Sequence, residues 1–260
     1  MKYNEELSML KTIVPKLFKL TEETEKKISY KQKNEIVTSS DLFIEKALIK
    51  EIESQFPGDN IHSEEFNRGT ELKDRTWLID PIDGTGNYAH NLDLFVMQIA
   101  LYDHNEVVLA YIYAPRFKKT FYAVKGEGAF LNGERISVNT DNSMSNSLLS
   151  LVGLSHQSKK DKKTFDYLID FARENALKVR VFGSAGFEMA SMAEGIFSVL
   201  YTDVSNYWDL APGLLLITEA GGFVVNELGL DYRLGDKQLF AFGNLEVKDK
   251  IMKYIKQKAE

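Results

Sequence analysis

The chain contains 260 residues, of which 44% are hydrophobic and 27% charged, and its formal net charge is −6. This much apolar material can fill one large domain or two subdomains, and it argues against disorder. A negative net charge offers no basic field for nucleic acid or for an anionic membrane, so neither is an expected partner. Cysteine is absent, which excludes disulfides, thiol nucleophiles and Cys-ligated zinc. No apolar run is long enough to span a membrane and the N-terminus lacks a signal-peptide core, so we expect a cytoplasmic protein.

The N-terminal part of the chain begins with two predicted helices. Residues 3–27 place apolar side chains at helical spacing, namely Leu7, Leu10, Val14, Leu17 and Phe18. A second helix is predicted over residues 41–54, with a buried face made of Leu42, Ala47, Leu48 and Ile52.

A block of strands follows these helices. A short strand is expected near Ile61, and an apolar strand over 75–80 is expected to stop at Pro81. Turn residues divide the segment 94–135 into three or more strands, which we expect to be antiparallel.

The pattern changes beyond 139–147, a stretch rich in serine and asparagine that suggests a linker. Strands and helices then alternate, as in a smaller α/β subdomain. The strands are predicted at 148–153, 178–182, 197–201 and 222–226, and the helices at 161–175, 184–194 and 208–219. We therefore predict an α+β subdomain over 1–140, carrying most metal ligands, and a smaller α/β subdomain over 141–260.

Acidic residues stand at several points where secondary structure is expected to begin or end. These residues are Asp41, Glu64, Glu65, Asp80, Asp83 and Asp209. Asp80 and Asp83 flank a stiff turn, because Pro81 fixes its own φ and Gly84 permits a tight turn or a close backbone approach. Taken alone, this pair could merely cap the segment that follows.

Two further carboxylates favour a metal site over a cap. Glu64 ends the strand near Ile61, and Asp209 begins a helix; if both converge on Asp80 and Asp83, each pair about 5 Å apart repels by roughly 3 kcal/mol at an effective dielectric constant of about 20. Such a cluster stays ionised only around cations, and oxygen ligands without Cys or His favour Mg²⁺ or Mn²⁺ over zinc. Two bridged cations can clamp a phosphate, activate a water and neutralise the leaving oxygen. The residues therefore predict a metal-dependent phosphatase.

Several segments, in the right order, resemble the inositol monophosphatase family of the fructose-1,6-bisphosphatase and lithium-sensitive phosphatase superfamily. WLIDPIDGTGNYAH at 77–90 resembles the signature D-P-I-D-G-T-x-N-F, and HSEEF at 62–66 resembles G-E-E. YWDLAPGLLLITEAGG at 207–222 resembles W-D-x-A-A-G followed by E-A-G-G, and VTSSD at 37–41 and the segment 113–138 also fit. The resemblance covers nearly the whole chain. It implies a layered α/β/α/β/α sandwich, often dimeric, and a lithium-sensitive, Mg²⁺-dependent phosphatase of small phosphomonoesters.

The resemblance also implies metal ligands. Glu64, Asp80 and the backbone carbonyl of Ile82 would hold a first cation. Asp80 would bridge to a second cation, completed by Asp83 and Asp209, and Glu64 would anchor a weaker third site. Two or three Mg²⁺ are therefore expected in each site, with Mn²⁺ as a possible substitute.

Catalytic roles follow from the same resemblance. Asp41 and Thr85 would orient and deprotonate the attacking water, and Glu64 would act beside them. A structural alternative stays open, because Asp41, Thr85 and Asp209 could each simply cap a helix. Lys31 and Lys33 could lie on a loop over the site or on an ordinary solvated face.

Substrate contacts are the least determined part of the site. They are implied for Gly84, Thr85, Ser184, Ala185 and Asp209. Inositol-specific members carry Glu and His at two positions where this chain has Thr202 and Asn206, and Gly86 replaces a second Thr of the signature. Fructose 1,6-bisphosphate, NADP and 3′-phosphoadenosine 5′-phosphate therefore stay open as substrates, and a non-catalytic binding protein with the same fold is the alternative of another class.

Overall fold

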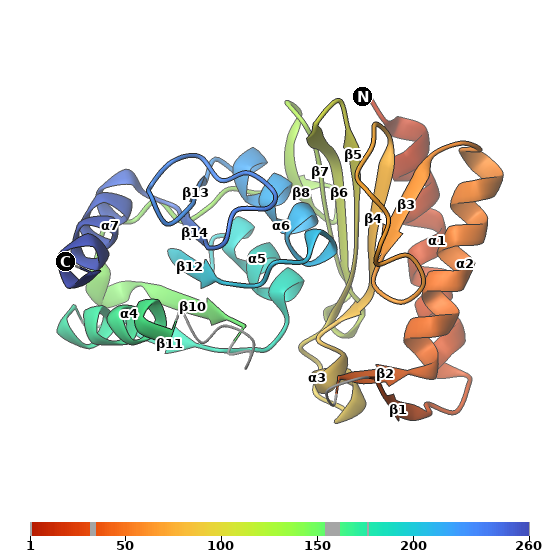
Figure 1. Ribbon diagram of the computed structural model, residues 1–260, viewed down its shortest axis with the longest axis horizontal. Helices are drawn as coiled ribbons and strands as arrows, with labels where there is room; N and C mark the ends of the chain where they lie inside the picture. Colours follow the sequence, from red (N-terminus) through yellow and green to blue (C-terminus); the bar gives the residue numbers. More distant parts are fainter. Residues whose placement is uncertain (1, 32–34, 154–161, 176, 260) are drawn as a thin grey trace.

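The computed structural model describes residues 2–259 except 32–34, 154–161 and 176, and it is built from five alternating layers (Figure 1). The helices of these layers are α1 (Asn4–Glu22), α2 (Ser39–Gln55), α4 (Lys162–Glu174), α5 (Ala185–Ala193), α6 (Tyr207–Glu219) and α7 (Leu245–Ala259). Helices α1 and α2 cover one large sheet, α5 and α6 lie between the two large sheets, and α4 and α7 cover the second (Figure 1). The predicted α/β/α/β/α sandwich is confirmed.

The first large sheet follows the strand order β3-β4-β5-β6-β7-β8-β9. Its strands are β3 (Asn60–Ser63), β4 (Thr76–Asp83), β5 (Val96–Asp103), β6 (Glu106–Ala114), β7 (Lys119–Val124), β8 (Gly128–Leu131) and β9 (Glu134–Arg135). Only the β3–β4 pair is parallel, so the antiparallel arrangement expected for 94–135 is confirmed. Both faces of the central strands are buried under helices, which explains why these strands read as nearly continuous apolar runs.

The second large sheet has the order β11-β10-β12-β14-β13. Its strands are β10 (Leu148–Val152), β11 (Lys178–Arg180), β12 (Val199–Thr202), β13 (Phe223–Val225) and β14 (Leu239–Phe242). The four strands expected here are present, whereas β14 and α7 were not predicted. The division into subdomains at residue 140 stays a prediction. Within the described residues, no helix has the length and apolar character needed to cross a bilayer.

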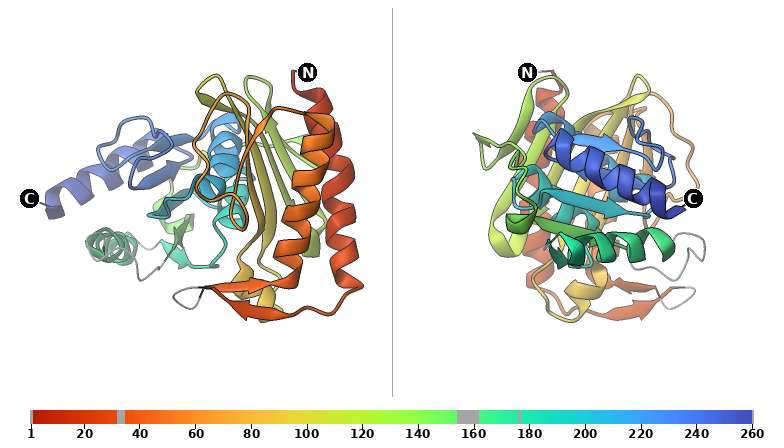
Figure 2. Two further views of the ribbon diagram at one scale, coloured as in Figure 1. Left: turned by 45° about the vertical axis from the view of Figure 1, so that its right-hand side comes forward. Right: turned by 90° about the vertical axis from the view of Figure 1, so that its left-hand side faces the viewer.

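Two expectations for the N-terminal helices were wrong. Helix α1 ends at Glu22 rather than 27, and the chain then forms a hairpin of β1 (Ile28–Tyr30) and β2 (Ile36–Thr38) beside α3 (Thr85–Ala89) (Figure 2). Between the helix and the hairpin, Lys26 Nζ donates to the backbone oxygen of Tyr88 at 2.7 Å and ties this segment to α3. Leu42 is 41% exposed rather than buried; the buried apolar face of α2 is formed by Ile44, Leu48 and Ile52.

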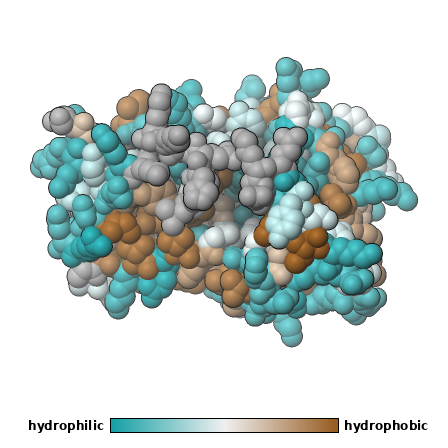
Figure 3. Space-filling view, turned by 60° about the horizontal axis from the view of Figure 1, so that its bottom comes forward, coloured by the Kyte–Doolittle hydropathy of each residue, from teal (hydrophilic) through white to brown (hydrophobic). Residues whose placement is uncertain are grey.

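Strand β4 continues through Pro81 instead of stopping there. Its register against β5 shifts between Asp80 and Asp83, so the proline stands at an irregularity where the ladder needs no N–H donor. The shift carries both carboxylates to the end of the strand where α3 and the β1–β2 hairpin lie (Figure 1). The surface at this end is largely hydrophilic, with separate apolar patches (Figure 3).

Candidate metal centre and active site

Three aspartates meet at the end of β4. Asp80, Asp83 and Asp209 each bring a carboxylate oxygen to a point where all three lie within 4.8 Å of one another. Asp80 is only 1% exposed and its Oδ1 has no hydrogen-bond partner among the described residues. The other oxygen, Oδ2, lies 3.5 Å from Nε2 of Gln98. The site thus contains a buried carboxylate oxygen that no protein donor satisfies.

The electrostatics of the cluster follow from burial and mutual repulsion. Burial, reinforced by the charges of Glu64 and Asp83, raises the pKa of Asp80 well above its usual range. Burial likewise raises the pKa of Asp209 to about 8, with Asp83 and Glu64 adding to the effect. Protons therefore neutralise the cluster at mildly acidic pH, and a divalent cation would displace them.

Asp83 differs from its two neighbours because the N-terminus of α5 provides it with donors. Ser184 Oγ and the Gly186 amide donate to Oδ2 at 2.5 and 2.7 Å, and the Ala185 amide donates to Oδ1 at 3.2 Å. Burial still raises its pKa to about 6, although these donors oppose the rise. Gly84 allows the close approach, since it has φ +85° and a Cβ there would lie 3.0 Å from the Cβ of Ser184. The observed role of Ser184 and Ala185 is to hold Asp83; their contact with substrate stays a prediction.

Glu64 lies beside the trio rather than within it. Its carboxylate forms ion pairs with Lys31 at 3.1 Å and with Arg68 at 3.2 Å. Burial alone would lower the pKa of Lys31, but Glu64 and Glu65 outweigh it and the net shift is upward. Burial raises the pKa of Glu65 to about 7. Lys31 is therefore a cation of the site in this structure, whereas Lys33 lies outside the described residues.

Asp41 and Thr85 are in contact, as a proton relay requires. Thr85 Oγ1 lies 3.3 Å from Oδ1 of Asp41 and 2.8 Å from the carbonyl oxygen of Ile82. Thr38, rather than Asp41, is the N-cap of α2; Asp41 stands three residues later in the capping box and accepts from the backbone N–H and the hydroxyl of Thr38. Burial raises the pKa of Asp41 to about 6 despite these donors. Asp41 can therefore take part in the helix cap and in a proton relay at the same time.

With this geometry in place, comparison with known proteins decides the family. The family model described as "Inositol monophosphatase family" matches residues 5–259. The chain belongs to the inositol monophosphatase family. Membership makes it a phosphatase of the inositol monophosphatase type, which acts on small phosphorylated compounds.

Individual relatives agree with the family model over nearly the full length. A Dictyostelium discoideum protein named inositol monophosphatase is 36% identical, with 97% of this chain and 94% of the relative covered. A Thermotoga maritima protein named fructose-1,6-bisphosphatase/inositol-1-monophosphatase is 34% identical, with 91% and 87% covered. A solved Thermotoga maritima inositol monophosphatase structure is similar with a TM-score of 0.83 and 30% identity, over 95% and 93% of the two chains.

Sequence reasoning missed three buried polar residues near the site. Gln98 lies inside β5 and donates to the backbone oxygen of Asp209 at 3.3 Å, thereby joining Asp209 to the strand beside Asp80. Glu45 accepts from Ser63 Oγ and from two backbone amides just after β3, which shapes the turn that carries Glu64. Glu188 accepts from the backbone amides of residues 182 and 183, just before Ser184. A lone polar residue inside an apolar run was the only available signal, and it was present for Gln98.

The two departures from the inositol-specific pattern have distinct surroundings. Thr202 is fully buried at the end of β12 and its Oγ1 accepts from the Val204 amide at 3.1 Å. Asn206 donates from Nδ2 to Oδ2 of Asp209 at 2.9 Å. Thr202 therefore stabilises the end of β12, and Asn206 orients the carboxylate of Asp209.

Proposed function

We propose that this phosphatase depends on Mg²⁺, held by Glu64, Asp80, the carbonyl of Ile82, Asp83 and Asp209. The observation that carries the proposal is the trio of carboxylates with oxygens within 4.8 Å of one another, together with an oxygen of Asp80 that lacks any donor among the described residues. An all-oxygen donor set suits Mg²⁺, with Mn²⁺ as a substitute. The four carboxylates among these ligands carry enough negative charge for two divalent cations, and Glu64 would anchor a weaker third one.

Bound Mg²⁺ would supply charge that neutralises phosphate oxygens, acidifies water and stabilises the leaving oxygen. The residues of the chain would perform the remaining steps. Thr85 would orient the attacking water and pass its proton to Asp41, which the 3.3 Å contact between their oxygens supports. A carboxylate whose pKa burial raises to about 6 is ionised near neutral pH and still basic enough to accept that proton. The backbone amides of Gly84 and Thr85 would contact the phosphate, and Glu64 would act beside the relay.

The alcohol portion of the substrate is the open part of this proposal. An inositol phosphate is the leading candidate, with Ser184, Ala185 and Asp209 near the alcohol. Fructose 1,6-bisphosphate is the second, because the relative from Thermotoga maritima carries both activities in its name. The absence of Glu and His at the positions of Thr202 and Asn206 weakens the inositol preference, and NADP and 3′-phosphoadenosine 5′-phosphate use the same phosphate chemistry. The presence of every proposed metal ligand argues against a non-catalytic binding protein.

The deciding experiment measures phosphate release from these four substrates with and without Mg²⁺. We expect release that requires Mg²⁺, that is inhibited by Li⁺, and that is fastest for one of the four. Equal release after complete chelation of divalent cations would refute the metal dependence. Release from none of the four in Mg²⁺ would favour the non-catalytic alternative.

A homodimer is supported by an apolar surface near the α5 N-terminus. Phe117 and Ile196 are exposed, and with Phe182 and Phe187 they line a cavity of about 290 Å³. Exposed apolar patches of this kind mark protein interfaces. Light scattering should give twice the chain mass for the natural sequence and a monomer for Phe117→Glu; a monomeric natural chain would refute the dimer.

The cytoplasmic location stays a prediction, which fractionation of cells containing the tagged protein would test.

A further inference from the structure

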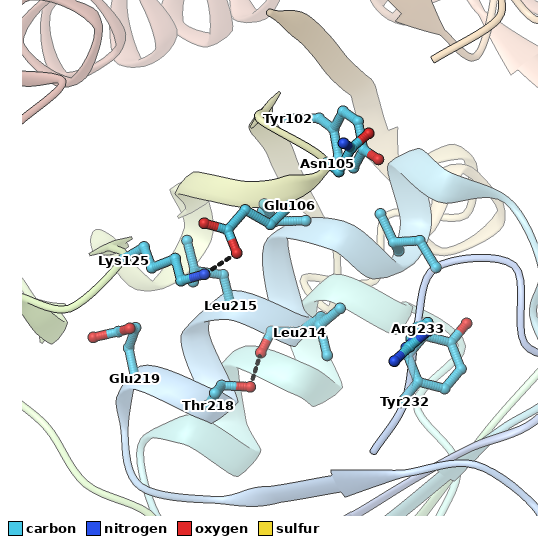
Figure 4. Close-up of a pocket in the computed structure, with 12 residues that line it drawn as sticks. Tyr102, Asn105, Glu106, Lys125, Leu214, Leu215, Thr218, Glu219, Tyr232 and Arg233 are labelled. Atoms are coloured by element: carbon cyan, nitrogen blue, oxygen red, sulfur yellow. Dashed lines mark hydrogen bonds and ion pairs between the residues drawn. The ribbon is translucent and has the colours of Figure 1, made fainter. Parts of the chain in front are cut away.

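A second cavity, whose lining includes none of the three clustered aspartates, has the volume and lining of a ligand site (Figure 4). It measures about 540 Å³, within the range of about 300–1,000 Å³ that is typical of small-molecule pockets. Its walls are the β5–β6 turn, the turn after β7, the second half of α6 and the loop that follows β13. The α6 residues that line it begin at Leu214, about 7 Å along the helix axis from Asp209. The cavity is therefore separate from the proposed active site but touches the helix that carries Asp209.

The inner wall of the cavity is apolar and partly aromatic. Val107, Leu215 and Tyr232 are buried residues of the core, and Tyr102 and Leu214 are partly buried against them. Such a wall favours a flat apolar ligand body, because aromatic rings and branched side chains pack against ring faces.

Most polar groups at the rim already have partners within the protein. Lys125 forms an ion pair with Glu106, and Glu219 accepts from the amides of Gly126 and Gly128, each at 2.7 Å. Thr218 Oγ1 donates to the Leu214 carbonyl at 2.8 Å (Figure 4). Lys125 and Glu106 therefore offset each other's charge, whereas Glu219 remains a carboxylate that two backbone amides hold in place.

Among the charged groups of the cavity lining, Arg233 is the one whose side chain has no partner in the part of the chain that the structure describes. It is exposed, and its guanidinium forms no hydrogen bond or ion pair with any residue that the structure describes. Figure 4 places Arg233 with Tyr232 at one end of the cavity, away from Glu106 and Glu219 at the other. A planar guanidinium beside an apolar wall suits a carboxylate, sulfonate or phosphate group.

We propose that this cavity binds a small molecule made of a flat apolar body and one anionic group. The body lies against Tyr102, Leu214 and Tyr232, and the anion pairs with Arg233. The site is additional to the phosphatase site and does not depend on the metal assignment.

The test uses 8-anilinonaphthalene-1-sulfonate, which combines such a body with one negative charge, and the neutral N-phenyl-1-naphthylamine as its uncharged counterpart. Binding to the folded chain is measured by fluorescence and calorimetry in saturating Mg²⁺ and inorganic phosphate, so that the proposed active site is blocked. We expect saturable binding of one sulfonate per chain. Arg233→Gln should weaken the sulfonate by about three- to tenfold and leave the neutral compound unchanged.

Two further variants make the test specific to this cavity. Thr218→Trp, at an exposed wall position, should fill the cavity and weaken both compounds by at least about tenfold. Arg173→Gln removes an exposed arginine of α4, whose one ion pair among the described residues is with Asp170 at 3.6 Å, and should change the binding of neither compound. The proposal is overturned by non-saturable binding, by binding that occurs only when Mg²⁺ and phosphate are left out, by equal effects of the two arginine variants, or by unaltered binding in a folded Thr218→Trp protein.

Discussion

The N-terminal and C-terminal regions of the chain contribute differently to the site. Residues 4–135 contribute most of its charge, in Asp41, Glu64, Asp80 and Asp83, whereas the C-terminal region adds Asp209 and the donors at 184–186. Asp83, which receives those donors, has a pKa near 6, but Asp80 lacks a donor on Oδ1 and its pKa lies well above the usual range. The difference shows that protein hydrogen bonds stabilise one carboxylate of the cluster, while another has an oxygen without a donor among the described residues, which the proposed cation would satisfy.

The largest effect is expected from removing the unsatisfied charge. Asp80→Asn should lower phosphate release by at least about a thousandfold, because the loss of the proposed bridging ligand would cost several kcal/mol in the transition state. The melting temperature of the metal-free protein should stay equal or rise, since a repelled, buried carboxyl is replaced by a neutral amide. Phosphate assays and thermal unfolding of the same sample measure both.

Asp59→Asn is the matched control for Asp80→Asn. Asp59 is held by Arg75 at 2.8 Å and by the indole N–H of Trp77 at 2.9 Å, so its loss should lower the melting temperature. If Asp80→Asn lowers the melting temperature and leaves turnover normal, then Asp80 stabilises the fold and has no role in catalysis.

The second prediction concerns pH. Asp209 has a folded-state pKa raised to about 8 by burial, against about 3.8 when unfolded, so between these values the folded chain holds a proton that the unfolded chain has lost. The contribution of Asp209 to the free energy of unfolding of the metal-free protein should therefore be fully present below about pH 4. It should fall by up to about 1.4 kcal/mol per pH unit as the pH rises towards 8. Urea unfolding at several pH values measures the slope.

Mg²⁺ should reverse this trend, because it binds the ionised carboxylates. The stabilisation by Mg²⁺ should be larger at pH 8 than at pH 6. Equal stabilisation at both pH values would contradict the assignment of raised pKa values to the cluster.

A smaller effect is expected from the donors of the C-terminal region. Ser184→Ala removes the hydroxyl that donates to Asp83 at 2.5 Å. Because the ionised carboxylate of Asp83 loses this hydrogen bond, the free energy of unfolding should fall by about 1.5–3 kcal/mol. Its turnover should fall, and its pH profile should shift to higher pH. Ser191→Ala is the control, because among the described residues its hydroxyl donates to the Phe187 carbonyl of the same helix and to no group of the site; identical pH profiles for the two variants would remove Ser184 from the site.

The smallest effect is expected from Lys31. Its ammonium pairs with Glu64 and Glu65 and so competes with cations for the same carboxylate. Lys31→Ala should reduce the Mg²⁺ concentration for half-maximal activity by about two- to threefold. An increased Mg²⁺ requirement would mean that Lys31 assists binding instead.

Sequence reasoning located the carboxylates better than it located their partners. Asp80 and Asp83 were predictable because Pro81 and Gly84 mark the end of an apolar strand, and the segment around Asp209 was predictable from its helical pattern. The donors of Asp83 were not, since Ser184 is about a hundred positions away in the sequence and only the packing of α5 against β4 brings the two together. Likewise, the shift in register at Pro81 depends on pairing with β5, and the exposure of Leu42 depends on which face of α2 meets the sheet.

The central claim is that the trio of aspartates retains protons until Mg²⁺ replaces them. Calorimetric titration of the metal-free protein with Mg²⁺ at pH 7, in two buffers of different ionisation enthalpy, counts the protons released. We predict release of about one proton or more per chain, and weaker binding with less release in Asp80→Asn. Binding of Mg²⁺ without proton release, and with the same affinity in Asp80→Asn, would contradict the account.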